Sequence, residues 1–133
     1  MKLLLDTHAF LWLINDDYAS LRGKAAVDLF LADDSIPFLS LVSVWEMAIK
    51  IRLGKFDLQQ PLAEFIPQQL ERNQIELLPI GLGHIVQTMA LPFHHRDPFD
   101  RLLIAQAMVE DMTLLSSDAA FDEYDVKRVW KFS

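Results

Sequence analysis

The sequence contains no cysteine, and this absence excludes disulfides, thiolate metal sites and cysteine nucleophiles. Its four glycines form neither a Gly-x-x-x-x-Gly-Lys loop nor a Gly-x-Ser-x-Gly elbow, so P-loop NTPases and serine hydrolases lack their essential parts. The four histidines do not have the spacing of a zinc site. The chemistry that remains available depends on carboxylates, hydroxyls and cations.

Long apolar runs are also missing. The first residues include too short an apolar run for a signal peptide, and the run over residues 9–14 is far below the roughly 20 residues that a membrane span needs. Together with the lack of cysteine, these features predict a cytoplasmic protein without a membrane partner.

Cations are fewer than acids, with 12 Lys and Arg against 19 Asp and Glu and a net charge of −7. This balance argues against broad, nonspecific adhesion to nucleic acids, which relies on cations that neutralise phosphates. Several cations nevertheless gather near candidate acids: Lys50, Arg52, Lys55, Arg96 and Arg101. They form either a basic rim around an acidic centre or solvated helix faces, with Lys50 paired to Glu46 one turn earlier.

The length of 133 residues and the hydrophobic content of 52% predict a single domain, residues 1–133, with a substantial core. Strand patterns occur at residues 2–6, 36–40, 75–80, 112–116 and 126–130. Helical patterns occur at 9–14, 21–32, 43–53, 61–72 (interrupted or kinked at Pro67), 82–90 and 98–111. Alternating strands and helices predict an α/β fold with a mainly parallel sheet covered by helices. Pro37 favours an edge position, or the start of its strand, for residues 36–40.

Four acidic residues occupy corresponding places in this pattern. Asp6 and Asp118 lie just past strands, and Glu46 and Asp100 lie in the first turns of helices. In a parallel sheet these places share one edge, where ligands bind, so all four carboxylates can face one crevice. Gathered carboxylates repel one another unless a cation neutralises them, and hard oxygen ligands suit Mg²⁺ or Mn²⁺. The sequence therefore predicts a divalent metal site.

Each acid also has a structural interpretation. Asp6 can begin a turn or cap the following helix. Glu46 completes a Ser-x-x-Glu capping box with Ser43, so capping and ligand roles are equally supported. Asp118 can be an ordinary turn residue.

The segment Asp97-Pro98-Phe99-Asp100 has the pattern of a helix start. Asp97 precedes a proline that suits the first helical position, which indicates a mainly structural N-cap. Asp100 then falls in the first turn, where the helix dipole already favours a negative charge. We interpret Asp100 as functional.

The candidate acids stand in four short motifs: Leu5-Asp6-Thr7-His8, Ser43-Val44-Trp45-Glu46, the run from Asp97 to Ala107, and Ser117-Asp118. Taken together, these motifs resemble the PIN-domain family, specifically the VapC-like toxins of bacterial toxin–antitoxin pairs. The resemblance implies a three-layer fold with a small, mainly parallel sheet flanked by helices. It also implies a Mg²⁺- or Mn²⁺-dependent endoribonuclease with Asp6, Glu46, Asp100 and Asp118 at the acidic positions. A cognate antitoxin, an RNA substrate and a homodimer are implied as partners. The fourth acidic position, here Asp118, is the least uniform in the family.

The expected reaction is hydrolysis of an RNA phosphodiester by a metal-activated water, which leaves a 5′-phosphate and a 3′-hydroxyl. Mg²⁺ usually takes one or two carboxylates directly, and Asp6 and Asp100 are the candidates. Glu46 and Asp118 would hold metal-bound waters or help to seat a second ion. Thr7, Ser43 and Ser117 are candidate hydrogen-bond donors near the acids, and Arg96 and Arg101 are candidate contacts to the RNA backbone.

Two rival functions belong to other classes. A catalytically silent PIN-like module would bind the antitoxin without cleaving RNA, which the complete acidic set disfavours. A phospho-receiver signalling domain also pairs acids with Mg²⁺ at strand ends, but it needs an Asp after its middle strand. We expect residues 75–80 to be that strand, and no Asp follows it.

Overall fold

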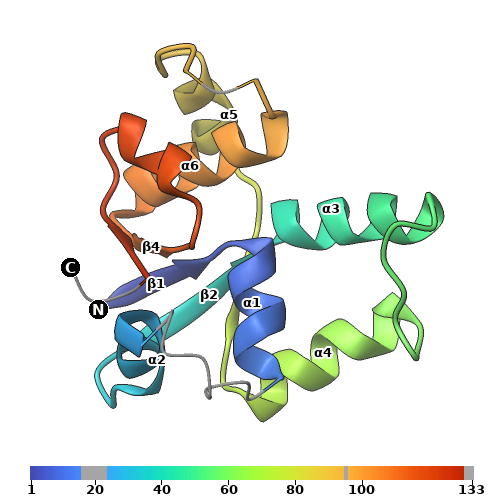
Figure 1. Ribbon diagram of the computed structural model, residues 1–133. Helices are drawn as coiled ribbons and strands as arrows, with labels where there is room; N and C mark the ends of the chain where they lie inside the picture. Colours follow the sequence, from blue (N-terminus) through green and yellow to red (C-terminus); the bar gives the residue numbers. More distant parts are fainter. Residues whose placement is uncertain (16–23, 95, 131–133) are drawn as a thin grey trace.

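Five parallel strands form the centre of the molecule (Figure 1). The computed structural model describes residues 1–15, 24–94 and 96–130. Within these ranges the strands are β1 (Lys2–Leu5), β2 (Ile36–Ser40), β3 (Glu76–Leu78), β4 (Thr113–Leu115) and β5 (Arg128–Val129). They are hydrogen-bonded in the order β3-β2-β1-β4-β5, and every pair is parallel. The predicted α/β fold with a mainly parallel sheet is confirmed.

Helices cover both faces of this sheet. In the described part they are α1 (Thr7–Ile14), α2 (Lys24–Leu31), α3 (Leu41–Arg52), α4 (Leu62–Arg72), α5 (Leu82–Thr88), α6 (Pro98–Glu110) and the 3₁₀ helix η2 (Ala119–Glu123). Figure 1 shows α1, α2 and α4 on one side of the sheet and α5 and α6 on the other. No helix in these ranges is both long enough and apolar enough to cross a membrane.

The core consists of two apolar clusters, one for each face of the sheet. Leu3 and Leu5 of β1 pack in one cluster with side chains of α1, α2 and α4, whereas Leu4 points into the other with side chains of α6. All three leucines are fully buried. A central parallel strand that is covered on both faces is continuously apolar, as this one is.

Each of two predictions about prolines left two alternatives open. β2 is an interior strand, so the edge position is wrong, whereas the alternative that Pro37 lies at the start of its strand is confirmed, since it is the second residue of β2. The ladder with β3 begins only at Phe38, so at Pro37 the strand has one neighbour, β1, and the missing N–H is tolerated there. Helix α4 continues through Pro67 to Arg72, so the predicted interruption is wrong, and the alternative of a kink at Pro67 stays a prediction. Residues 21–23, predicted to begin the second helix, lie outside the described residues.

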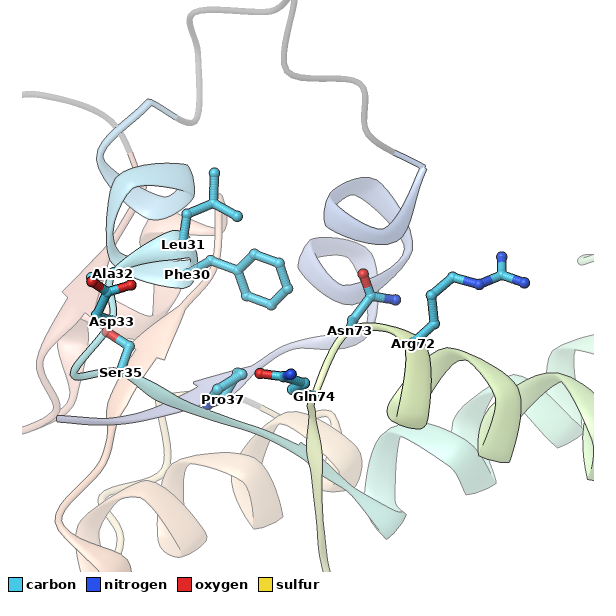
Figure 2. A pocket seen from close by; sticks show the side chains of 9 residues that line it. All are labelled: Phe30, Leu31, Ala32, Asp33, Ser35, Pro37, Arg72, Asn73 and Gln74. Atoms are coloured by element: carbon cyan, nitrogen blue, oxygen red, sulfur yellow. The ribbon is translucent and has the colours of Figure 1, made fainter.

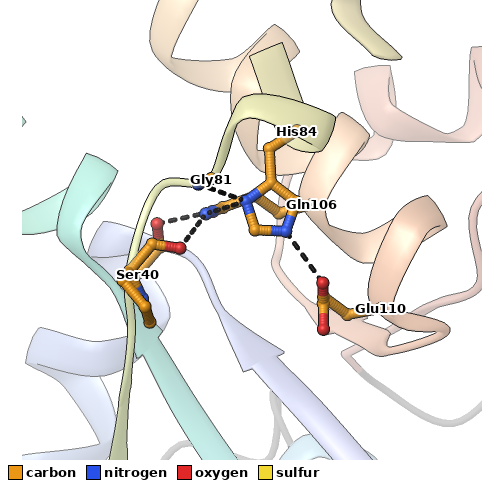
Figure 3. Close-up of polar contacts among 6 residues, drawn as sticks. Ser40, Gly81, His84, Gln106 and Glu110 are labelled. Atoms are coloured by element: carbon orange, nitrogen blue, oxygen red, sulfur yellow. Dashed lines mark hydrogen bonds and ion pairs between the residues drawn. The ribbon is translucent and has the colours of Figure 1, made fainter. Parts of the chain in front are cut away.

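A buried polar network joins α6 to both β2 and α5 (Figure 3). The fully buried Gln106 of α6 accepts a hydrogen bond from the Ser40 hydroxyl at 2.5 Å and directs its Nε2 towards His84 Nδ1 at 3.3 Å. Nδ1 of His84 accepts from the Gly81 amide, so Nε2 carries the proton that it donates to Glu110 at 2.9 Å. The network fixes α6, which carries Asp100, against the junction where α3 begins.

Candidate active site at the carboxyl edge of the sheet

Asp6, Glu46, Asp100 and Asp118 line one cavity of about 190 Å³, which we call the acidic cavity. The structure thus brings these four side chains together, as their places in the sequence predict. Asp6 follows β1 and Asp118 lies beyond β4, while Glu46 and Asp100 come from α3 and α6. The other lining residues are Thr7, His8, Lys50, Asp97, Leu103, Ser117 and Phe121.

Asp6 is the most deeply placed of these acids, with only 8% of its surface exposed. It is the N-cap of α1, and its Oδ1 accepts a hydrogen bond from the Ala9 amide at 2.7 Å. Burial raises the pKa of its carboxyl, and the negative charge of Asp118 adds to this, against the opposing effects of hydrogen bonds from Ser116 and Ala9 and of the His8 charge. The predicted capping role is real, and it coexists with a position in the cavity.

Glu46 does not belong to a capping box. Helix α3 begins at Leu41 with Ser40 as its N-cap, so the predicted start at Ser43 is wrong by two residues. Glu46 is therefore one turn further into the helix than its local pattern suggested. Its Oε1 accepts a hydrogen bond from the Thr7 hydroxyl at 2.6 Å, and its Oε2 lies 3.3 Å from Lys50 Nζ.

Asp97 and Asp100 enter the cavity from the start of α6. Asp97 is the N-cap, as predicted, and accepts from the Phe99 amide at 2.9 Å. It also lines the cavity, which its structural interpretation did not include. Asp100 is half-buried in the first turn, where its charge lies near the positive end of the helix dipole.

Asp118 is the most exposed of the four predicted acids. It caps η2 by accepting from the Ala120 amide at 3.0 Å, so the turn interpretation is correct as well. Its own amide donates to the hydroxyl of the buried Ser116 at 3.0 Å, and Ser116 also hydrogen-bonds to Asp6. Ser116 thus links the two acids that follow neighbouring strands.

The donor chemistry of the acidic cavity suits a hard divalent cation. Its five carboxylates face a single lysine, Lys50, and all offer oxygen ligands of the kind that Mg²⁺ and Mn²⁺ prefer. In the ranges that the structure describes, no three acidic or histidine side chains are placed to hold an ion jointly. Mg²⁺ usually keeps several waters and takes only one or two carboxylates directly, so it does not require three protein ligands in one place.

The remaining sequence candidates divide into those inside and those outside the cavity. Thr7 and Ser117 line it. Ser43 does not, and its buried hydroxyl has no hydrogen-bond partner among the described residues. Arg96 lies in a neighbouring groove. Arg101 donates to the carbonyls of Thr88 and Pro92 at the end of α5 and stacks over Phe93, so its guanidinium supports α5 and does not line the cavity.

Ser116 was not identified from the sequence as a site residue, and Lys50 was placed only in a rim of cations around the acids or in a pair with Glu46. Ser116 faces Asp6 because Leu5 and Leu115 are paired in the sheet and each is followed by one of these residues. Strand pairing was needed to choose Ser116 over Ser117. For Lys50 the signal was available, since the four-residue spacing from Glu46 already placed both side chains on one helix face.

A larger cavity of about 520 Å³ lies at the opposite, amino edge of the sheet (Figure 2). It is bounded by Pro37 near the start of β2 and by Asn73 and Gln74 ahead of β3, and Asp33 is the one acid among the described residues that line it. Ligand sites in open parallel sheets lie at the carboxyl edge, so this cavity is a less suitable active site despite its size.

The strand order also bears on the phospho-receiver alternative. Receiver domains have the order 2-1-3-4-5, whereas the order here is β3-β2-β1-β4-β5. Our assignment of residues 75–80 as the middle strand was wrong, because β3 lies at the edge and β1 is central. The strand order therefore excludes the receiver fold. It replaces the argument from a missing Asp, which depended on the wrong middle strand.

Comparisons with known proteins agree with this topology. A family model described as PIN domain matches residues 3–127. No curated protein gives a significant match. Among solved structures, VapBC2 from Rickettsia felis, bound to a DNA fragment from its promoter, has a TM-score of 0.73 and 16% identity, with 98% of this chain and 100% of that chain covered. VapBC-1 from nontypeable Haemophilus influenzae has a TM-score of 0.63, 15% identity and 96% of each chain covered. A toxin–antitoxin complex from Klebsiella pneumoniae has a TM-score of 0.56 and 15% identity, with 88% of this chain and 87% of that chain covered. At these identities the similarity establishes a shared fold.

Proposed function

This chain belongs to the PIN-domain family, and from that premise we propose that it is a divalent-metal-dependent endoribonuclease, the toxin of a toxin–antitoxin pair. One observation carries the catalytic part of the proposal. Four acids from distant parts of the chain, Asp6, Glu46, Asp100 and Asp118, converge on one small cavity at the carboxyl edge of a parallel sheet. A binding module without catalysis has no need to concentrate negative charge in this way.

The cavity residues suggest a division of labour. Asp6 and Asp100 would hold a divalent cation. When bound, the cation supplies a Lewis acid that activates water and stabilises charge on the phosphate. The Thr7 hydroxyl holds one oxygen of Glu46 at 2.6 Å and so fixes the orientation in which this carboxylate can accept a hydrogen bond from water. Asp118 would accept a hydrogen bond from a further water at the solvent-exposed side of the acidic cavity. Lys50 provides a positive charge in the lining for the substrate phosphate.

RNA cleavage tests this proposal. The wild-type protein should cut single-stranded RNA when Mg²⁺ or Mn²⁺ is supplied and should leave 5′-phosphate ends. Asp100→Asn should lower the rate by at least about 100-fold, which corresponds to the removal of roughly 3 kcal/mol of transition-state stabilisation. Asp125→Asn is the matched control, because Asp125 is exposed and lies outside the acidic cavity. Equal activity of the two variants, or a 2′,3′-cyclic phosphate product, would contradict the mechanism.

Metal binding can be measured without any RNA. Calorimetric titration of Mn²⁺ into the wild type should give a binding isotherm that weakens strongly in Asp100→Asn and is retained in Asp125→Asn. Both variants remove one negative charge, so general electrostatics cannot explain a difference between them. Mn²⁺ binding that is the same in all three proteins would remove Asp100 from the metal site.

The toxin part of the proposal is supported by the VapBC and toxin–antitoxin structures that share this fold. Expression in a bacterial host should arrest growth, the Asp100→Asn variant should not, and co-expression of a small protein encoded beside this gene should restore growth. Growth arrest that persists in Asp100→Asn would mean that toxicity does not come from the acidic cavity.

A homodimer is the oligomeric state that we propose. Large apolar side chains on and after α5 support a protein contact there, since Leu82, Met89 and Phe93 are 77%, 85% and 75% exposed. Light scattering should give a mass near twice the 15.3 kDa of one chain. A monomer at micromolar concentration would refute this proposal without affecting the nuclease proposal.

A further inference from the structure

A second groove adjoins the acidic cavity and shares three lining residues with it, Glu46, Lys50 and Asp97. It has a volume of about 480 Å³ and runs between the C-terminal half of α3 and the start of α6. Its remaining lining residues are Ile49, Leu53, Lys55, Arg96, Pro98 and Phe99. We call it the flank groove. A chain-like ligand that reached the acidic cavity could continue into it without a break.

Apolar side chains form one wall of the flank groove. Ile49 and Leu53 are four residues apart on α3, and Trp45 precedes them by four on the same helix face. Trp45 is 56% exposed, and its ring meets that of Phe99 edge to face, with ring centroids 5.0 Å apart. This aromatic pair therefore lies beside the groove and presents open ring surface.

Cations distinguish this groove from an ordinary apolar contact surface. Lys50, Lys55 and Arg96 all line it, in a chain whose net charge is −7. Lys50 is paired with Glu46, whereas the side chains of Lys55 and Arg96 form no ion pair with a carboxylate anywhere in the described ranges. Unpaired cations beside exposed aromatic rings are the combination that binds single-stranded nucleic acid, through phosphates and stacked bases.

We propose that the flank groove binds the stretch of single-stranded RNA next to the phosphate held in the acidic cavity. Lys55 and Arg96 contact successive backbone phosphates, and a base stacks on the exposed ring of Trp45. This inference rests on the proposed ribonuclease function and adds to it the residues that hold the strand beyond the cleaved phosphate. The strand must be unpaired at this groove, because only an unstacked base can reach an aromatic side chain. An apolar protein segment would match the wall but would leave both cations uncompensated.

The test measures RNA binding separately from cleavage. Fluorescence anisotropy would follow a labelled twelve-nucleotide oligouridylate that binds to the Asp100→Asn protein in Mg²⁺, at several salt concentrations. Lys55→Gln and Arg96→Gln should each weaken binding and lower the slope of log K against log salt by about 0.7, the value for one phosphate contact on a single strand. Trp45→Leu should weaken binding about tenfold through lost stacking, with the slope unchanged.

Arg52→Gln is the matched control. Arg52 lies on the same helix as Lys50 and is exposed, but it does not line either cavity. It should leave the salt slope unchanged, although it removes the same charge. Circular dichroism should give the same helix signal for every variant, since all the replaced side chains are at least partly exposed.

Three results would overturn the inference. The first is that the Lys55→Gln and Arg96→Gln proteins bind RNA with the same affinity and salt slope as the Arg52→Gln protein. The second is no measurable binding of the oligouridylate by the parent protein. The third is a change in oligomeric state or antitoxin affinity with RNA affinity unchanged, which would make the groove a protein interface. Cleavage by the wild type that depends on Asp100 would preserve the nuclease function in all three cases. RNA binding with the expected salt slopes but without cleavage would refute the proposed nuclease function and would still support RNA binding in the flank groove.

Discussion

Gln106 offers a direct test of how the helices that carry Glu46 and Asp100 are held together. Its side chain accepts from the Ser40 hydroxyl at 2.5 Å and donates to the Pro79 carbonyl at 3.3 Å, and both Gln106 and Ser40 are fully buried. Gln106→Met keeps a side chain of similar length and removes all of these hydrogen bonds. The Ser40 hydroxyl then has no acceptor in the network, and Pro79 loses a donor.

The cost can be worked from these contacts. A buried polar group that loses its partner costs about 1–3 kcal/mol. The contact to Pro79 is longer than an optimal hydrogen bond and should contribute at the low end of that range. Burial of the methionine offsets part of the loss. We expect the free energy of unfolding to fall by about 2–3 kcal/mol, a large share of the 5–15 kcal/mol typical of a domain.

Urea unfolding followed by tryptophan fluorescence measures this change. Gln68→Met is the control, because Gln68 is exposed on α4, and its cost should stay within about 0.5 kcal/mol. The Ser40→Ala and Gln106→Met changes should also be coupled, with the double variant at least about 0.5 kcal/mol less destabilised than the sum. A cost below about 0.5 kcal/mol for Gln106→Met, or strict additivity with Ser40→Ala, would refute the reasoning.

Two further predictions concern backbone conformation and surface charge. Gly54 follows α3 with a φ of +74°, so Gly54→Ala should lower the free energy of unfolding by about 1 kcal/mol in thermal or urea melts. Gly83 lies in α5 with open space around it, so Gly83→Ala should raise the free energy of unfolding by about 0.5 kcal/mol. Equal effects of the two substitutions would contradict this reasoning. The Arg128 guanidinium holds the pKa of Asp122 below its usual 3.8, so the stabilisation that it provides is present above that pH and is lost as the pH falls through the lower, folded-state pKa. Melting temperatures of wild type and Asp122→Asn should therefore differ at pH 6 and converge as the pH is lowered below 3.8, and a difference that grows over that range would refute the assignment.

Much of the candidate site could be predicted because its signals are local. The Asp97-Pro98 pair marks a helix start through the fixed φ of proline and the free amides of a first turn, and the structure has its N-cap there. Asp6 follows a short apolar run of the kind that a buried parallel strand carries. The convergence of Asp6, Asp100 and Asp118 then followed from the geometry of parallel sheets, whereas Glu46 reaches the cavity from the second turn of its helix.

Local signals failed where two of them competed. Ser40 and Ser43 both precede helical sequence, and the Ser-x-x-Glu pattern favoured Ser43. The structure uses Ser40, because that residue ends β2 and meets Gln106, which is 66 positions away in the chain. The same kind of long-range contact explains Arg101, whose guanidinium is taken up by the carbonyl groups at the end of α5.

The sequence by itself determined the alternation of strands and helices, the acids at their junctions and the family to which the chain belongs, because these depend on neighbours along the chain. The tertiary structure decided which strand is central, which serine lies beside Asp6 and which cations share a groove with the acidic cavity. Each of those depends on strand order and register, which are set by packing between segments distant in sequence. Side-chain type therefore predicts the chemistry that is available, and packing decides which side chains meet.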